Sequence, residues 1–186
     1  MVSPALVLSG PPGVGKTTVA WRVFDFCTDA GDDPGLIDLD LMGACWPAPH
    51  DDPHQTRLKA ANAAAVWSNF RAAGSRRLIV AGVVESAAEQ LLLSHAVQAP
   101  VLVCRLAAST EMLEDRIRGR GRDHGADLAK LIRRAQALQT QLVADDVADF
   151  VIQTTDRAVE EVASNVLHRW NSASGGPTEK PMKPHV

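Results

Sequence analysis

One stretch decides the fold of this chain: Gly10-Pro11-Pro12-Gly13-Val14-Gly15-Lys16-Thr17-Thr18. It matches the pattern G-x-x-x-x-G-K-[ST] at every fixed position, directly after a predicted strand at Ala5–Ser9 and before a predicted helix. Glycines let the backbone turn its N–H groups inward, and the following helix adds the positive end of its dipole. We therefore expect these residues to wrap a bound polyphosphate.

Three side chains of this loop have expected roles of their own. We expect Lys16 to reach the β- and γ-phosphates and Thr17 to offer its hydroxyl to Mg²⁺, while Thr18 lies in the first helical turn near the phosphates. The alternative is a Gly/Pro-rich turn that carries Lys-Thr by chance. The strand before the motif and the helix after it favour the phosphate-binding interpretation.

A pair of carboxylates follows the next apolar run, in the sequence Leu36-Ile37-Asp38-Leu39-Asp40. The pair falls at the end of a predicted strand, at the edge of the sheet where open α/β folds bind ligands. If the strand continues, a spacing of two turns both side chains the same way. We predict that Asp38 serves the metal and that Asp40 accepts the proton of an attacking hydroxyl. A strand-end turn with a helix cap is the alternative.

Short apolar runs alternate with longer amphipathic stretches throughout, which is typical of repeated βα units around a parallel sheet. Several runs are continuous Val/Ile/Leu segments, as expected of strands buried on both faces. The sequence therefore predicts an α/β fold with helices on both sides of the sheet. The five predicted strands are Ala5–Ser9, Gly35–Leu39, Arg77–Gly82, Val101–Leu106 and Asp149–Gln153.

Apolar stripes at helical spacing predict two helices late in the chain. The second of them runs from Val159 to Trp170, with Thr155 or Asp156 placed to cap its first turn. Beyond Trp170 the chain is rich in Ser, Gly, Pro and Lys, so we expect one domain over residues 1–170 and a disordered tail over 171–186. The first stripe comprises Leu128, Leu131, Ile132, Ala135, Leu138 and Leu142.

Composition excludes several classes of protein. The 186 residues suit one α/β domain, and 46% apolar with 22% charged residues is ordinary globular usage. A net charge of -3 gives no global attraction to nucleic acid or to an anionic membrane, so we expect neither as a partner. Three scattered cysteines and a short N-terminal apolar run favour a cytoplasmic location. The oligomeric state stays open between monomer and dimer.

An arginine-rich stretch, Glu111 to Asp123, carries Arg116, Arg118, Arg120 and Arg122. Arg116 and Arg120 share a helical face, so both can point toward a nucleotide. The intervening glycines give the loop freedom to close, and we expect a lid over residues 117–127. A solvated helix end is the alternative.

Together these motifs resemble the small P-loop kinases, which include shikimate, gluconate, adenylylsulfate and chloramphenicol kinases and the nucleoside monophosphate kinases. The resemblance covers roughly residues 5–167. It implies the three-layer P-loop fold with a five-stranded parallel sheet of order 2-3-1-4-5, and ATP and Mg²⁺ as cofactors. Because shikimate kinases carry D-x-D at the place of the aspartate pair, it also implies that Asp40 faces the acceptor hydroxyl.

The segment Asp115–Arg120 is similar to the lid entry of nucleoside monophosphate kinases. That resemblance implies that Arg116 stacks on adenine and that Arg120 contacts the transferring phosphate. Arg133 or Arg134 from the next helix would be a further clamp.

The resemblance also places the loop after the last strand, with Thr155 and Arg157, against adenine. The sequence contains no Asn-Lys-x-Asp, the guanine-reading element of GTPases, so we expect ATP rather than GTP.

The acceptor side differs from the nucleoside monophosphate kinases. These have an arginine after the third strand, whereas this chain has Glu85 there, which argues against a nucleotide acceptor. Glu85 either binds an acceptor hydroxyl or positions Mg²⁺, or it opens the next helix near its dipole. Residues 41–74 should form a helical cap in which Trp46 walls an apolar pocket and Arg57 grips a carboxylate or phosphate.

Other polar and aromatic residues have simpler interpretations. His50 and His54 are four apart, but Pro53 lies between them, so we do not expect a helical zinc pair. We expect Trp21 and Trp67 in the core.

The sequence thus predicts ATP-dependent phosphoryl transfer to a hydroxyl of a small-molecule acceptor, with Lys16, Asp40 and Arg120 as the catalytic residues. A nucleoside monophosphate kinase and a non-catalytic ATP-binding regulatory module are the alternatives. Phosphorylation of nucleic-acid ends ranks last, because the basic residues cluster at the lid and form no track toward the aspartate pair. The identity of the acceptor stays open.

Overall fold

A five-stranded parallel sheet forms the middle layer of the computed structural model, which describes residues 3–121 and 123–175. Its order is β2-β3-β1-β4-β5, so the predicted α/β fold and strand order are confirmed. Every strand begins and ends within one residue of its predicted bounds. The strands are β1 (Ala5–Ser9), β2 (Pro34–Asp38), β3 (Arg77–Ala81), β4 (Val101–Ala107) and β5 (Phe150–Gln153).

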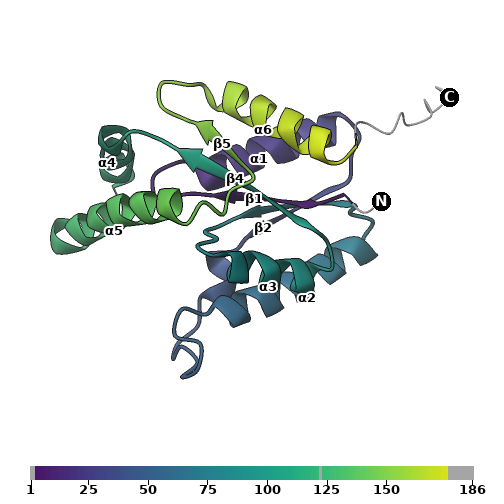
Figure 1. The fold of residues 1–186 in the computed structure, drawn as a ribbon, viewed down its shortest axis with the longest axis horizontal. Helices are drawn as coiled ribbons and strands as arrows, with labels where there is room; N and C mark the ends of the chain where they lie inside the picture. The colour runs from purple at the N-terminus through teal and green to yellow at the C-terminus, as the bar shows by residue number, and fades with distance from the viewer. Residues whose placement is uncertain (1–2, 122, 176–186) are drawn as a thin grey trace.

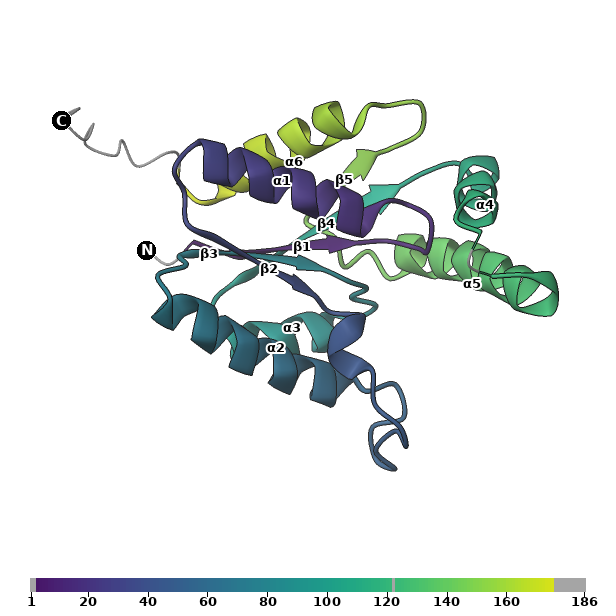
Figure 2. The same ribbon diagram turned by 180° about the vertical axis from the view of Figure 1, so that it is seen from behind.

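Helices cover both faces of the sheet (Figures 1 and 2). One layer holds α1 (Lys16–Asp29) and α6 (Val159–Ala173), and the other holds α2 (Thr56–Ala72) and α3 (Ala87–Val97). A further pair, α4 (Thr110–Gly119) and α5 (Gly125–Ala144), lies beyond the end of the sheet toward which the strands point (Figure 2). Within the described ranges, every helix is too short or too polar to cross a bilayer.

Alternating side chains of the strands fill two separate apolar cores. Leu6 and Leu8 of β1 face the layer of α1 and α6, whereas Ala5 and Val7 face the layer of α2 and α3. Trp67 of α2 is buried in the second core, as predicted. Because both faces are covered, the strands are mostly apolar, which is why the sequence identifies them so well.

Trp21 was also expected in the core, and this prediction is wrong: the residue is 54% exposed. The buried face of α1 is made by Val19, Ala20, Val23 and Cys27. Trp21 lies off that face and packs edge-on against Phe24, with 5.5 Å between ring centroids. Amphipathic helices commonly leave such a residue outside the apolar stripe.

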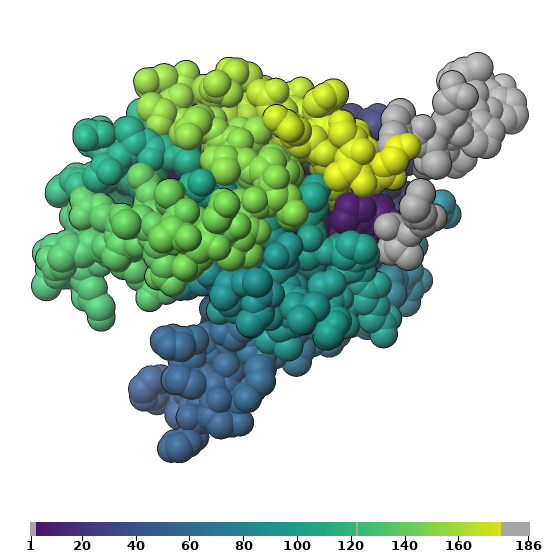
Figure 3. Space-filling model, in the orientation of Figure 1, coloured from purple at the N-terminus to yellow at the C-terminus, as the bar shows by residue number. Residues whose placement is uncertain are grey.

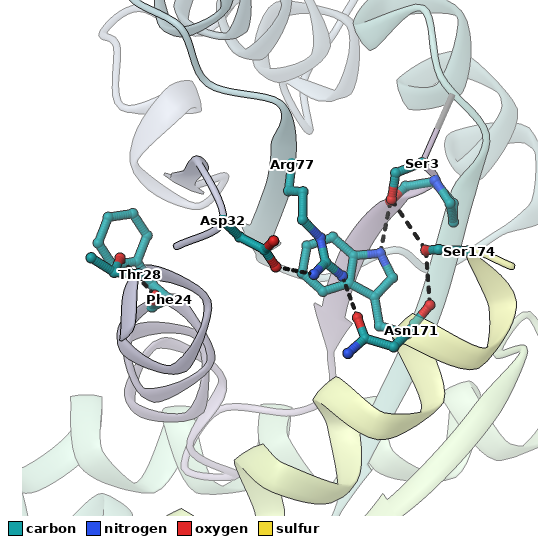
Figure 4. A network of polar contacts seen from close by, with 9 residues as sticks. Ser3, Phe24, Thr28, Asp32, Arg77, Asn171 and Ser174 are labelled. Carbon is teal, nitrogen blue, oxygen red and sulfur yellow. Dashed lines mark hydrogen bonds and ion pairs between the residues drawn. The ribbon is translucent and has the colours of Figure 1, made fainter. Parts of the chain in front are cut away.

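Helix α6 is fixed to the sheet by Arg77 at the start of β3 (Figure 4). Its guanidinium donates to Asp32 at 2.6 Å and to Asn171 at 2.8 Å, and its central carbon lies 3.7 Å from the centroid of the Trp170 ring. The Trp170 ring nitrogen donates to the carbonyl of Pro4 at 2.8 Å. These contacts carry the helix to Ala173, past the end predicted at Trp170. The rest of the expected tail, 176–186, and Arg122 lie outside the described residues.

Segment 41–55 protrudes from the body of the molecule as a loop that begins with the short helix η1 (Leu41–Gly43), at the bottom of Figure 3. Helix α2, which follows it, packs Ala63 and Trp67 against the sheet. Of the expected cap over 41–74, only this first part protrudes, and Met42 within it still packs against the second core.

Candidate active site

The phosphate-binding loop joins β1 to α1, with Lys16 as the first residue of the helix. Gly15 is the N-cap with φ of 99°, and no side chain caps the helix, so the first-turn N–H groups are left for a ligand. The Lys16 ammonium donates to the carbonyls of Gly10 at 2.9 Å and Pro11 at 3.4 Å. The lysine thus curls back over the loop, as a phosphate-binding lysine must.

Gly10 shows why the motif begins with glycine. Its φ is +148°, and a Cβ there would lie 2.6 Å from the carbonyl oxygen of Leu106 on the neighbouring strand β4. A side chain would have to displace backbone, which is costly. The loop can therefore leave the sheet here only without a side chain.

Thr17 and Asp38 meet at the base of the loop. The Thr17 hydroxyl donates to Asp38 Oδ2 at 3.2 Å, and Asp38 Oδ1 accepts the backbone N–H of Asp40 at 3.1 Å. Hydroxyl and carboxylate oxygens are the ligands that Mg²⁺ prefers. The part of the chain that the structure describes has no cluster of three or more His, Cys, Asp or Glu side chains that would bind a metal unaided. Such a sparse protein contribution suits Mg²⁺ that is shared with phosphates and water.

Asp40 does not lie on a continuation of strand β2, as its spacing from Asp38 had suggested. Strand β2 ends at Asp38, and Asp40 is the helical N-cap of η1 with φ of -66° and ψ of -30°. The strand-continuation argument is therefore wrong. The Leu39 N–H still donates to the Ala81 carbonyl of β3 at 2.7 Å, and the chain turns into η1 directly after it. This turn places the exposed Asp40 at the acceptor cavity, which is described below.

The electrostatics of Lys16 show that three charged side chains act on it. Burial lowers the pKa of its ammonium; Arg120 lowers it further, whereas Asp40 and Asp38 oppose the decrease. Asp38, Asp40 and Arg120 therefore each lie within electrostatic range of Lys16, although Arg120 is more than 100 residues away in sequence. The three predicted catalytic residues are brought together.

A cavity of about 270 Å³ lies on the α6 side of the loop. Arg116 of α4 frames it by donating to the carbonyls of Val14 at 3.3 Å and Thr154 at 2.9 Å, and to the Thr154 hydroxyl at 3.0 Å. Arg116 thus connects α4 to the phosphate-binding loop and to the segment after β5. The lining residues are Gly13, Val14, Gly15, Thr18, Val19, Arg116, Arg120, Thr154, Arg157, Val159 and Val162. We call this space the nucleotide cavity.

Thr155 was expected both at the base site and as a helix cap, and it does not line this cavity. Its hydroxyl accepts the backbone N–H of Ser109 at 2.9 Å instead. Asp156 adopts φ of 52°, which turns the chain so that α6 begins only after Ala158, without a side-chain cap. Both capping predictions are therefore wrong. Thr154, which is buried, lines this cavity in place of Thr155.

A second cavity of about 200 Å³ is lined by residues of α2, α3 and α5, of the loop after β3 and of the segment after β2. It contains Asp40 and Glu85, as predicted for an acceptor site. It also contains Arg134, one of the two arginines proposed as a clamp. The lining residues are Leu39, Asp40, His54, Thr56, Lys59, Ala60, Val83, Val84, Glu85, Glu89, Leu92, Leu93 and Arg134. We call this space the acceptor cavity.

Two predicted acceptor contacts, Trp46 and Arg57, lie outside the acceptor cavity. Trp46 is 93% exposed on the protruding segment. Arg57, on the first turn of α2, forms an ion pair with Asp51 and donates to its carbonyl. Side chains on a loop cannot be assigned to a side of the molecule from sequence, because neither helical nor strand periodicity applies to them.

Glu89 shows which acidic residue opens α3. Ser86 is the N-cap and accepts the Glu89 N–H at 3.2 Å, while Glu89 accepts the N–H of Glu85 at 2.8 Å. This is a variant of the S-x-x-E capping box, visible in Ser86-Ala87-Ala88-Glu89 but not considered for the site. Glu89 therefore holds the helix end, which leaves the Glu85 carboxylate free to face the cavity.

Lys59 is the functional candidate that sequence reasoning missed. It is the one lysine between Lys16 and Lys130, and it shares a helical face with Thr56 and Ala60, which also line the cavity. Its position as a single lysine in a long stretch without others was the feature of the sequence that could have indicated a functional role.

Comparison with solved structures places this architecture among known folds. The tunicamycin resistance protein of Deinococcus radiodurans matches with a TM-score of 0.61 and 19% identity, over 90% of this chain and 95% of that one. A gluconokinase from Sinorhizobium meliloti 1021 matches with a TM-score of 0.60 and 13% identity, over 94% of this chain and 95% of that one. Shikimate kinase from Acinetobacter baumannii, solved with shikimate, matches with 0.58 and 19%, over 91% and 93%.

The chain has the fold of the small P-loop kinases. The expected resemblance is thereby confirmed for the architecture. No family model matches the sequence, and comparison with curated proteins found no match. At identities of this size the P-loop kinase fold carries over to the chain, whereas the acceptor must be argued from its own residues.

Proposed function

We propose that this protein transfers the γ-phosphoryl group of ATP to a hydroxyl of a small-molecule acceptor. One observation supports the proposal: the charge of Lys16, on the phosphate-binding loop, interacts with Arg120, which lines the first cavity, and with Asp40, which lines the second. A phosphoryl group bound at Lys16 would be reachable from both. This arrangement is what direct transfer between two bound molecules requires.

The nucleotide cavity supports ATP as the donor. The loop N–H groups and Lys16 would bind the β- and γ-phosphates, and Arg116 and Arg157 would flank the base. Thr17 and Asp38 would hold Mg²⁺, which when bound neutralises charge on the phosphates.

The transfer step follows from the position of Asp40. Its carboxylate would accept the proton of the acceptor hydroxyl as the oxygen forms a bond to the γ-phosphorus. The bond from phosphorus to the bridging oxygen breaks at the same time, and ADP keeps that electron pair. Lys16 and Arg120 would stabilise the charge that develops on the transferring group.

A screen for ATP-dependent gain of one phosphate mass tests this function, run over a library of hydroxylated metabolites and antibiotics. Lys16→Ala protein serves as the blank. We expect at least one compound to be phosphorylated by the wild-type protein and none by the variant. ADP release that no compound accelerates, together with a protein partner that binds only in the presence of ATP, would favour a regulatory module instead.

The role of Asp40 is tested with the compound found. Asp40→Asn should lower kcat by about 10²–10⁴-fold, because a general base is lost, while ATP binding is retained. Asp29→Asn is the matched control, since Asp29 is exposed at the opposite end of α1 from the phosphate loop. Full turnover by Asp40→Asn would contradict the assignment.

A further inference from the structure

The acceptor cavity contains charged groups that the protein itself does not pair. Among the described residues, the Glu85 carboxylate, the Lys59 ammonium and the Arg134 guanidinium have no hydrogen-bond or ion-pair partner, and the Asp40 carboxylate has only the longer-range attraction of Lys16. Unpaired charges of both signs that face one cavity are groups left for a ligand.

Lys59 enters the cavity from α2 along a path that Gly43 keeps open. A Cβ at Gly43 would lie 2.7 Å from Lys59 Cε and 3.0 Å from its Cγ, so the lysine stem lies directly on the glycine. Lys59 is half-buried as a result. Its ammonium therefore has a supported direction and is not a freely moving surface charge.

Glu85 enters from the loop between β3 and α3, which is fixed on both sides. The N–H of Val84 donates to the buried Ser9 hydroxyl at 3.1 Å, and the N–H of Glu85 donates to Glu89 at 2.8 Å. A half-buried carboxylate on a fixed backbone, with no partner of its own, attracts a cationic group. Leu39, Val84 and Leu93 supply an apolar wall between the charges.

We infer that the acceptor is a compact zwitterion: a hydroxylated molecule with a protonated amine for Glu85 and a carboxylate for Lys59, its reacting hydroxyl at Asp40. The inference rests on the proposed kinase function. A purely anionic acceptor would meet the carboxylates of Asp40 and Glu85, and a purely cationic one would meet Lys59 and Arg134. The cavity of about 200 Å³ has room for roughly seven water molecules, which suits a compact metabolite.

The inferred contacts also direct the chemistry to oxygen. An amine that Glu85 keeps protonated has no lone pair to attack phosphorus. The hydroxyl oxygen therefore forms the new bond to phosphorus, its proton passes to Asp40, and ADP leaves with the electrons of the broken bond. The product is an O-phosphorylated zwitterion.

The experiment sorts acceptors by charge. Hydroxy amino acids and hydroxylated amino sugar acids are each assayed beside an amine-free counterpart, a carboxylate-free counterpart and neutral polyols. For L-serine, the amine-free counterpart is 3-hydroxypropionate and the carboxylate-free counterpart is ethanolamine. The full metabolite library is screened in parallel. We expect the phosphorylated compounds to carry both an amine and a carboxylate.

Two variants then test the individual contacts. Glu85→Gln should lower kcat/KM for the zwitterion about 10- to 100-fold, mainly through KM, and should not lower it for the amine-free counterpart. Lys59→Met should likewise lower kcat/KM for the zwitterion and should not lower it for the carboxylate-free counterpart. Glu111→Gln and Lys130→Met, which are exposed and line neither cavity, are the matched controls.

Three outcomes would overturn the inference. Phosphorylation of neutral polyols or simple hydroxy acids alone would refute the zwitterion and leave the kinase function standing. Equal loss of activity with zwitterion and amine-free counterpart in Glu85→Gln would show a merely structural role for Glu85. If no compound in the library is phosphorylated, the kinase function itself fails, and the acceptor class fails with it.

Discussion

At the scale of single residues, Lys16 illustrates how a binding site opposes stability. Lys16 is half-buried, and burial lowers the pKa of its ammonium from the ordinary value. A group that is harder to protonate in the folded state weakens folding at every pH below its folded pKa. The positive charge that lowers stability is the same charge that would bind a phosphate group.

Replacing Lys16 with Met should therefore raise stability and abolish function. The unfolded chain binds the lysine proton more tightly than the folded one, so the destabilisation fades as pH rises through the folded pKa toward the unfolded one. We expect Lys16→Met to be more stable than wild type without nucleotide, with an advantage that shrinks as pH increases. Denaturant unfolding at several pH values measures it.

The same variant should lose the response to ATP. At ATP 100 times above its Kd, the wild-type protein should gain about 2.7 kcal/mol, whereas Lys16→Met should gain far less. A variant that is less stable than wild type at every pH would show that the contacts of Lys16 with the Gly10 and Pro11 carbonyls outweigh its desolvation.

At the scale of elements, Arg77 joins three segments that are distant in sequence: β3, the loop before β2 and helix α6 (Figure 4). The contacts combine an ion pair, a neutral hydrogen bond and a cation–π contact with the fully buried Trp170. All lie at the end of the sheet opposite the two cavities.

Arg77→Met should lower the free energy of unfolding by roughly 1–3 kcal/mol, because it removes these contacts and leaves their partners unsatisfied. Arg76→Met is the neighbouring control: Arg76 is exposed and only loosely paired with Asp33 at 3.6 Å, so a change within about 0.5 kcal/mol is expected. Equal effects of both variants in chemical denaturation would contradict the assigned role. Catalytic activity should be unchanged in both folded variants.

At the scale of the whole molecule, the two layers of helices separate buried from accessible thiols. Cys27 and Cys104 are fully buried, and Cys45 is exposed on the protruding segment. Burial raises the pKa of the Cys27 thiol to about 11, and burial also raises the pKa of Cys104. Thiolate is the reactive form, so both buried thiols should be inert in the native protein.

A chromogenic thiol reagent at about pH 8 should therefore label one thiol of the native protein quickly and all three after denaturation. Cys45→Ser protein should show almost no fast labelling. Fast labelling of two or more thiols in the native protein would mean that the core opens more readily than its packing implies.

Much of the architecture was already determined by the sequence, for a local reason. Strands buried on both faces are apolar throughout, and the loop Gly10–Thr18 has a fixed spacing that stands between one strand and one helix. Lys16, Thr17 and Asp38 could be assigned because their roles depend on position relative to that loop and to the end of β2.

Only the tertiary structure decided which side chains face the acceptor. Lys59 and Glu89 come from helices far apart in sequence and meet at one cavity, whereas Trp46 and Arg57, equally plausible by residue type, lie outside it. Asp40 reaches the cavity through a turn that no strand periodicity predicts, and Thr155 gives way to Thr154 because Asp156 turns the chain. The loop proposed to bind phosphate could be found from the sequence because it is one continuous segment. The cavity proposed for the acceptor is lined by distant segments of the chain, and only folding brings these together.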